Sequence, residues 1–168
     1  MRGLFSFPNP VDEVSARLVA GGVVILCAAA IILDQPWLTL VIAYGFVARV
    51  LSGPTLSPLG QLVTRGIRPL LRVAAKPVPG PPKRFAQGIG AVLSVVAAVL
   101  VFGFGLRLAG YTVLAVLAVA ATLESVFALC LGCVMFGWLM RAGLIPEPIC
   151  QECNDIWNRN RGSAARAG

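Results

Sequence analysis

The segment FAQGIGAVLSVVAAVLVFGFGL, residues 85–106, decides the fold class because it contains no charged residue. A helix needs about 20 consecutive apolar residues to cross the hydrocarbon core of a bilayer. The segment reaches that length, and its Gly and Ala residues allow neighbouring membrane helices to approach closely. We therefore expect a membrane-spanning helix here, and close packing explains its glycines without a phosphate-binding loop.

Further apolar segments lie on both sides of this one, at residues 14–33, 37–51 and 111–140. Polar turns are expected at residues 34–36 and 107–110. The second segment is short for a span, whereas the fourth is over-long, so it tilts or its end leaves the hydrocarbon. The sequence predicts an all-α fold, a four-helix transmembrane bundle over residues 14–140. Val134 to Met140, with Trp138, is expected to run along the inner interface or just beyond it.

The composition agrees with a membrane protein of one domain. Hydrophobic residues make up 58% of the chain and charged residues 12%, whereas soluble domains average about 45–50% and about 25%. The chain contains no histidine. Catalysis, metal ligation and pH switching by histidine are therefore excluded.

The basic residues predict the orientation. Of the 14 Lys and Arg residues, only Arg107 lies in the turns after the first and third segments. Cytoplasmic loops are the ones rich in Lys and Arg. We expect a multi-pass protein of the cell (inner or plasma) membrane with a cytoplasmic N-terminus (1–13), loop (52–84) and tail (141–168). The positive charge is then a topology signal, and no nucleic-acid partner is expected.

The cytoplasmic loop contains a predicted amphipathic helix, Leu59–Lys76. On a helical wheel, one narrow face carries Gln61, Arg65, Arg68, Arg72 and Lys76. The opposite side is apolar, a pattern typical of an interfacial helix that binds the anionic inner leaflet. An acidic soluble partner is the alternative. Pro69 is expected to divide this helix, and the Pro-rich residues 77–82 are expected to form a non-helical connector.

Four of the five cysteines form two CxxC motifs, Cys130–Cys133 and Cys150–Cys153, separated by sixteen residues. This spacing matches a four-thiolate zinc site. In the reducing cytosol, CxxC pairs are usually redox-active or metal-binding. About 20 residues from Tyr111 reach the inner boundary, so the first pair is expected at the cytoplasmic interface. Gly143, Pro146 and Pro148 let the chain turn back, so the second pair can approach the first there. Cys27, alone in the first span, is interpreted as a small buried hydrophobe.

Glu124 is the one ionisable residue deep in an expected span. Such residues are functional candidates by default. On a continuous helix it points away from Cys130 and Cys133, so it is a poor acid or base for them. The structural alternative is a neutral or paired carboxyl that faces Arg49.

Several short motifs carry a family resemblance. They are Asn9-Pro10-Val11-Asp12 with Arg17, Ser57-Pro58-Leu59, Pro82-Lys83-Arg84-Phe85-Ala86, and Leu123-Glu124 followed by Cys130-Leu131-Gly132-Cys133. The chain resembles an uncharacterised family of small bacterial membrane proteins, known as a domain of unknown function, over about residues 8–140. The resemblance implies four spans and no established activity, and the second CxxC lies beyond it. The chain is more distantly similar to four-helix membrane thiol oxidoreductases that use quinone, which act on the outer side.

Three functions remain open. The first is a thiol redox or sulfur-transfer relay at the cytoplasmic membrane face, between the two CxxC pairs and a soluble cytoplasmic thiol or sulfur-carrier protein. In this relay Cys130 or Cys133 is the nucleophile and the other is the resolving thiol. The second is a structural or assembly protein in which Cys130, Cys133, Cys150 and Cys153 bind zinc. The third is a small transporter component that depends on Glu124.

Overall fold

The computed structural model describes residues 11–53, 55–71, 77–78 and 80–143. The fold is all-α apart from one two-residue pairing of β1 (Val11–Asp12) with β2 (Pro77–Val78). Its helices are α1 (Glu13–Ile32), α2 (Trp37–Ser52), α3 (Pro58–Gln61), α4 (Arg68–Leu71), α5 (Gly80–Ala98), α6 (Arg107–Phe127) and α7 (Leu131–Arg141). Two π-helical segments, η1 (Leu62–Ile67) and η2 (Val99–Gly103), follow α3 and α5 directly.

Within this described part, three helices are long and apolar enough to cross a membrane. They are Glu13–Ile32, Gly80–Gly103 and Arg107–Phe127. The first and third predicted spans are thereby supported as helices, and the chain has the features of a multi-pass membrane protein. Helix α2 matches the second predicted segment but is a shorter apolar helix. A fourth crossing therefore stays a prediction.

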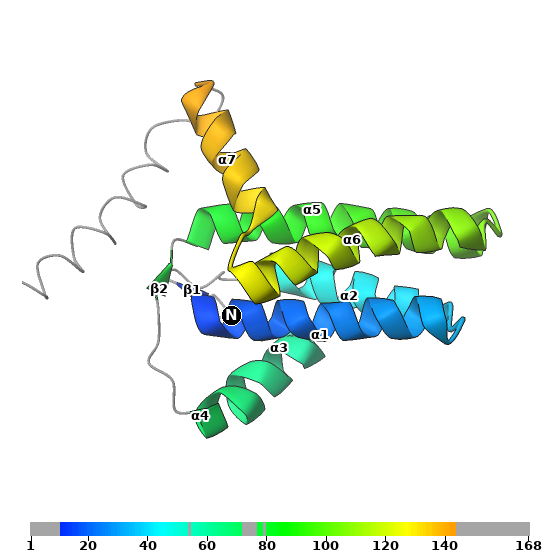
Figure 1. Cartoon of the computed structure of the whole chain (residues 1–168), viewed down its shortest axis with the longest axis horizontal. Helices are drawn as coiled ribbons and strands as arrows, with labels where there is room; N and C mark the ends of the chain where they lie inside the picture. Colours follow the sequence, from blue (N-terminus) through cyan, green and yellow to red (C-terminus); the bar gives the residue numbers. More distant parts are fainter. Residues whose placement is uncertain (1–10, 54, 72–76, 79, 144–168) are drawn as a thin grey trace, which may run out of the picture.

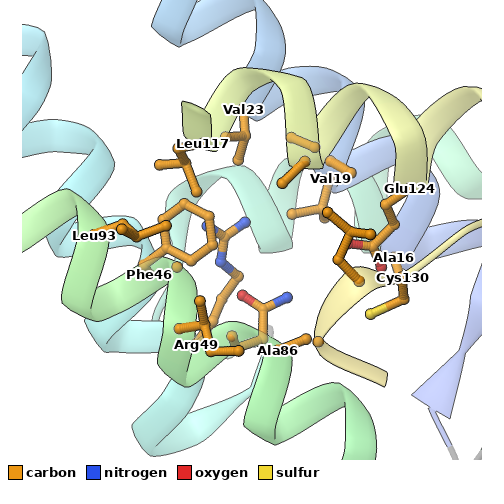
Figure 2. A pocket seen from close by; sticks show the side chains of 18 of the residues that line it. Ala16, Val19, Val23, Phe46, Arg49, Ala86, Leu93, Leu117, Glu124 and Cys130 are labelled. Atoms are coloured by element: carbon orange, nitrogen blue, oxygen red, sulfur yellow. The ribbon is translucent and has the colours of Figure 1, made fainter. Parts of the chain in front are cut away.

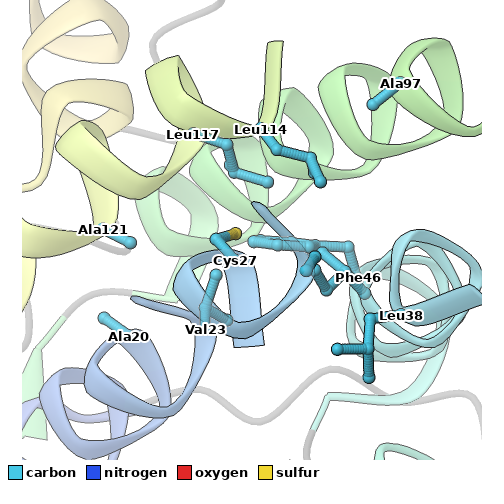
Figure 3. Close-up of a cluster of buried hydrophobic side chains, with 11 residues drawn as sticks. Ala20, Val23, Cys27, Leu38, Phe46, Ala97, Leu114, Leu117 and Ala121 are labelled. Atoms are coloured by element: carbon cyan, nitrogen blue, oxygen red, sulfur yellow. The ribbon is translucent and has the colours of Figure 1, made fainter. Parts of the chain in front are cut away.

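Helices α1, α2, α5 and α6 run alongside one another and share one apolar core (Figure 1). In this core α1 packs on α6 and α2, while α5 packs on α2 and α6. Leu38, Leu114 and Leu117 lie in it together with Cys27 (Figure 3). The Cys27 side chain is fully buried, which confirms its interpretation as a small hydrophobe.

The expectation of one continuous helix from Tyr111 to Met140 is wrong. Helix α6 ends at Phe127, and Ala128 adopts a left-handed conformation with φ 56°. Cys130 is extended and caps the start of α7. Helix α7 leaves the bundle at a steep angle (Figure 1). Hydropathy could not reveal this break because both helices are apolar and no Pro or Gly lies between Tyr111 and Leu131.

The opposite end of the bundle holds the two predicted polar turns side by side. The Asp34 carboxylate accepts hydrogen bonds from Arg107 Nη1 at 3.2 Å and from the Tyr111 hydroxyl at 2.7 Å. The expectation that residues 107–110 form the second turn is wrong, because they are the first turn of α6. The chain reverses earlier, at Phe104–Leu106, where Gly105 has φ +69°.

The prolines of the long loop interrupt its helices less than the sequence predicted. Pro69 does not divide the helix, because the π-helical segment η1 leads directly into α4. The Pro-rich connector was expected to be non-helical up to residue 82, but α5 begins at Gly80 and includes Pro81 and Pro82. The first turn of a helix tolerates proline, since its N–H groups have no partner within the helix.

Candidate functional site

The cysteine pair Cys130–Cys133 lies at the start of helix α7. Cys130 is the N-cap residue, and its carbonyl accepts the first helical hydrogen bond, from Val134 N at 3.0 Å. Cys133 lies in the first turn. Both thiols are reduced, and Cys130 is buried while Cys133 is half-buried. A helix N-terminus stabilises negative charge. The helix break between α6 and α7 therefore places the pair where a thiolate is favoured.

Contacts from α1 and α5 hold this break in place. The Arg17 side chain donates from Nε to the carbonyl of Ser125 (3.0 Å) and from Nη2 to that of Val126 (3.1 Å). These are carbonyls of the last turn of α6, which lack partners within the helix. On the other side of the break, Gly132 lies directly against α5. A Cβ at Gly132 would stand 2.5 Å from Ala86 Cα, so α7 can approach this closely only with glycine.

An ion pair lies beside the two thiols. Lys83 Nζ in the first turns of α5 is 2.5 Å from Glu124 Oε1 near the end of α6. The structural alternative was a neutral or paired Glu124 carboxyl that faces Arg49; the carboxylate is paired, but its partner is Lys83. The expectation that Glu124 points away from the cysteines is also wrong, because that geometry required a continuous helix. Figure 2 shows Glu124 and Cys130 next to each other.

The thiols and the ion pair form one electrostatic cluster. A hydrogen bond from the Cys133 thiol lowers the pKa of Cys130 and raises the pKa of Cys133. The Lys83 ammonium also favours the Cys130 thiolate, whereas burial and the Glu124 carboxylate oppose it. The cluster therefore favours a single thiolate, on Cys130, with Cys133 as its proton-bearing neighbour.

Cys130 forms part of the wall of two separate spaces. One is an open cleft of about 470 Å³ that is also lined by Lys83, Cys133 and Phe136. The other is a more enclosed cavity of about 200 Å³ inside the bundle, which Arg49 also lines (Figure 2). Cys130 therefore borders both the surface cleft and the cavity inside the bundle.

Several predicted site residues lie outside the described residues: Arg72, Lys76, Cys150 and Cys153. Zinc binding by four cysteines therefore stays a prediction. In the loop, Arg65 is exposed, and Arg68 forms an ion pair with Asp12 next to the β1–β2 pairing. Lipid binding by these arginines likewise stays a prediction.

Sequence reasoning missed the roles of Lys83 and Arg17. Lys83 was assigned to the loop because the third span was expected to begin at Phe85. Lys83 directly follows Pro81 and Pro82 and lies just before the apolar run. This pattern could have suggested that the helix begins earlier, with the two prolines in its first turn. Arg17 was used as a topology signal and as part of the family resemblance. Its position near the cytoplasmic end of a span gave no indication that it binds carbonyls 108 and 109 residues away.

The family model described as Domain of unknown function (DUF4395) matches residues 11–141. This range includes Glu124, Cys130 and Cys133 and ends before the second CxxC. No curated protein and no solved structure matches the chain.

Proposed function

The chain belongs to the DUF4395 family, a domain of unknown function, and we propose that it is a multi-pass membrane protein whose Cys130–Cys133 pair relays electrons or sulfur to a partner. The observation that carries this proposal is the position of the pair at the start of α7, beside the Lys83–Glu124 ion pair. Thiolates are the reactive species in sulfur exchange, and helix N-termini and nearby cations stabilise them.

The geometry supports Cys130 as the nucleophile and Cys133 as the resolving thiol. In thiol–disulfide exchange, the Cys130 thiolate attacks a partner disulfide, and one partner sulfur leaves as a thiolate that takes up a proton. Cys133 then loses its proton and attacks Cys130, which releases the second partner sulfur. The partner gains two electrons and two protons, while Cys130 and Cys133 become a disulfide. The open cleft beside both thiols gives a partner access to the pair.

The proposal can be tested on purified protein in mild detergent. Incubation with an oxidised small-molecule disulfide should yield a Cys130–Cys133 disulfide, identified by peptide mass spectrometry. Cys133→Ala should trap a mixed disulfide at Cys130, and Cys130→Ala should abolish the reaction. Cys27→Ala is the matched control and should react normally. If Cys130 and Cys133 react no faster than Cys27, the relay proposal fails.

The same sample distinguishes the zinc alternative. Bound zinc, with Cys130, Cys133, Cys150 and Cys153 all protected from alkylation, would replace the relay with a structural site. Metal-free protein with titratable thiols supports the relay. Cys150→Ala and Cys153→Ala should leave the reaction of the first pair intact if that pair acts alone.

We further propose the four-span topology with both termini cytoplasmic. The Lys and Arg residues gather in and next to the N-terminus, the long loop and the tail, which supports this topology. The arrangement of the bundle supports it too, because the end of α1 and the start of α6, which Asp34 and Arg107 join, lie at the end of the bundle away from the start of α7 (Figure 1). The thiols would then face a reducing compartment and a soluble thiol or sulfur-carrier protein.

Reporter fusions test this topology. Fusions at residue 35 and at the C-terminus should lie on opposite sides of the membrane; the same side for both would overturn the topology.

A further inference from the structure

The partly open cavity of about 200 Å³ lies where α1, α2, α5 and α6 meet the start of α7. Its walls are mostly apolar and include Phe46, Leu93 and Leu117 (Figure 2). At about 200 Å³ it is smaller than the usual range for drug-sized ligands. It is larger than a 150 Å³ engineered cavity that takes up benzene, so it suits a molecule of about that size.

Arg49 gives this cavity an unbalanced positive charge. Its side chain is buried, with 5% of the residue exposed, and its cationic carbon lies 4.3 Å from the centre of the Phe46 ring. Stacking occupies a face of the guanidinium and does not use its in-plane N–H groups. Among the described residues, neither Nε nor Nη1 has a hydrogen-bond partner. An arginine cannot relieve this by losing its proton, since it stays charged in proteins.

The neighbouring acid does not balance Arg49. Glu124 also lines the cavity, but its carboxylate is paired with Lys83. Arg49, Lys83 and Glu124 together carry a net charge of +1, and Arg49 is the one of the two cations that lines the cavity. Gln87, a third polar lining residue, has a buried Oε1 that also finds no donor in the described structure. A buried charge normally has a partner, so these orphaned groups indicate a ligand.

We propose that this cavity binds a small organic monoanion, such as a carboxylate with a compact apolar body. The anionic group accepts hydrogen bonds from Arg49, and the apolar body fills the space beside Phe46 and Leu117. This site goes beyond the proposed relay, because none of its binding groups is a thiol. Cys130 contributes only to the wall.

Benzoate and its uncharged analogue benzamide are suitable probes because they share shape and size. With the full chain in lipid nanodiscs, benzoate should bind in calorimetry and raise the melting temperature. Benzamide should bind at least tenfold more weakly. Arg49→Met should lose at least tenfold in benzoate affinity, whereas the exposed Arg65→Gln is the matched control and should bind normally. Equal binding of the two probes, or unchanged binding by Arg49→Met, would overturn the proposal.

Two further variants keep the test decisive if Arg49→Met does not fold. Arg49→Lys keeps the charge and should retain part of the affinity. Ala120→Leu fills part of the cavity without touching Arg49 and should weaken benzoate; unchanged binding by Ala120→Leu would place the anion elsewhere. Cys133→Ser removes a thiol of the relay but does not line this cavity. It should bind benzoate normally, so failure of the relay and failure of this site are distinguishable.

The anion could come from water or from the bilayer, and chain length separates these sources. A water-soluble acid confined to the cavity predicts that octanoate binds more weakly than benzoate. Tighter binding of octanoate, increasing further with chain length, would assign the site to membrane fatty acids and overturn the size limit.

Discussion

Lys83 in α5 and Glu124 in α6 form an ion pair in which Nζ and Oε1 are 2.5 Å apart. Their side chains are 10% and 18% exposed, so neither charge is well solvated. The pair connects the first turns of α5 to the end of α6, immediately before the chain turns toward the cysteines.

Breaking this pair should be costly. Lys83→Met or Glu124→Leu leaves one charge buried without its partner, and we expect each to lower the free energy of unfolding by about 3 kcal/mol. The double variant should lose much less, because no unpaired charge remains. Unfolding in mixed micelles measures this cycle. Arg107→Met is the matched control, since its pair with Asp34 is about 60% exposed on both sides and should contribute under about 1 kcal/mol. Additive single effects would contradict the coupling.

Replacing Ala128 by Gly should stabilise the protein, whereas the same substitution inside a helix usually destabilises it. Its φ of 56° is unfavourable for a residue with a Cβ, by about 1–2 kcal/mol. Ala128→Gly should therefore stabilise the protein by about 1 kcal/mol, and Ala128→Val should destabilise it. Ala118→Gly, inside α6, is the control and should destabilise by about 1 kcal/mol. If Ala128→Gly behaves like Ala118→Gly, the break between α6 and α7 is not present in the membrane.

The pH dependence of alkylation should identify the reactive thiol. Because the hydrogen bond from Cys133 lowers the pKa of Cys130, the Cys130 thiolate persists to lower pH than an ordinary thiolate. Its alkylation rate should therefore reach half its maximum at a lower pH than the rate of an unperturbed cysteine thiol. Cys133→Ala removes the donor and should shift the midpoint upward, whereas Cys133→Ser keeps a donor and should shift it less. Stopped-flow alkylation with Cys27, Cys150 and Cys153 replaced by Ala measures this; an unchanged midpoint in Cys133→Ala would remove the hydrogen bond as its cause.

Helix α7 should lie in the membrane interface. Its exposed apolar side chains recur at helical spacing on one face: Leu131, Val134, Met135 and Trp138. The helix also leaves the bundle steeply rather than continuing α6 (Figure 1). A spin label at residue 138 should report a shallow depth, and one at the exposed Val96 of α5 should report a greater depth. Equal depths at the two positions would show that α7 crosses the bilayer.

Much of the helical framework could be predicted from hydropathy. Predicted residues 14–33 correspond to α1 at Glu13–Ile32, and residues 37–51 correspond to α2 at Trp37–Ser52. Uniformly apolar runs predict such helices because the bilayer requires every backbone group to be bonded within the segment.

The site could be predicted only in part. The CxxC motif and Glu124 were visible as candidates, but their proximity was not. Their juxtaposition depends on Ala128 in a left-handed conformation and on Arg17 binding the final carbonyls of α6. Both are tertiary effects, because an alanine between apolar residues carries no local signal for a helix end.

The position of Cys130 between the open cleft and the bundle cavity has a kinetic consequence. One sulfur atom cannot bond two partners at the same time, so a reagent arriving from the bundle interior competes with one arriving from the surface. Any exchange between them through Cys130 therefore follows a ping-pong mechanism, with the first product released before the second substrate reacts. Such a protein would couple two pools of reagents without moving a domain, and double-reciprocal rate plots for the two substrates would be parallel lines.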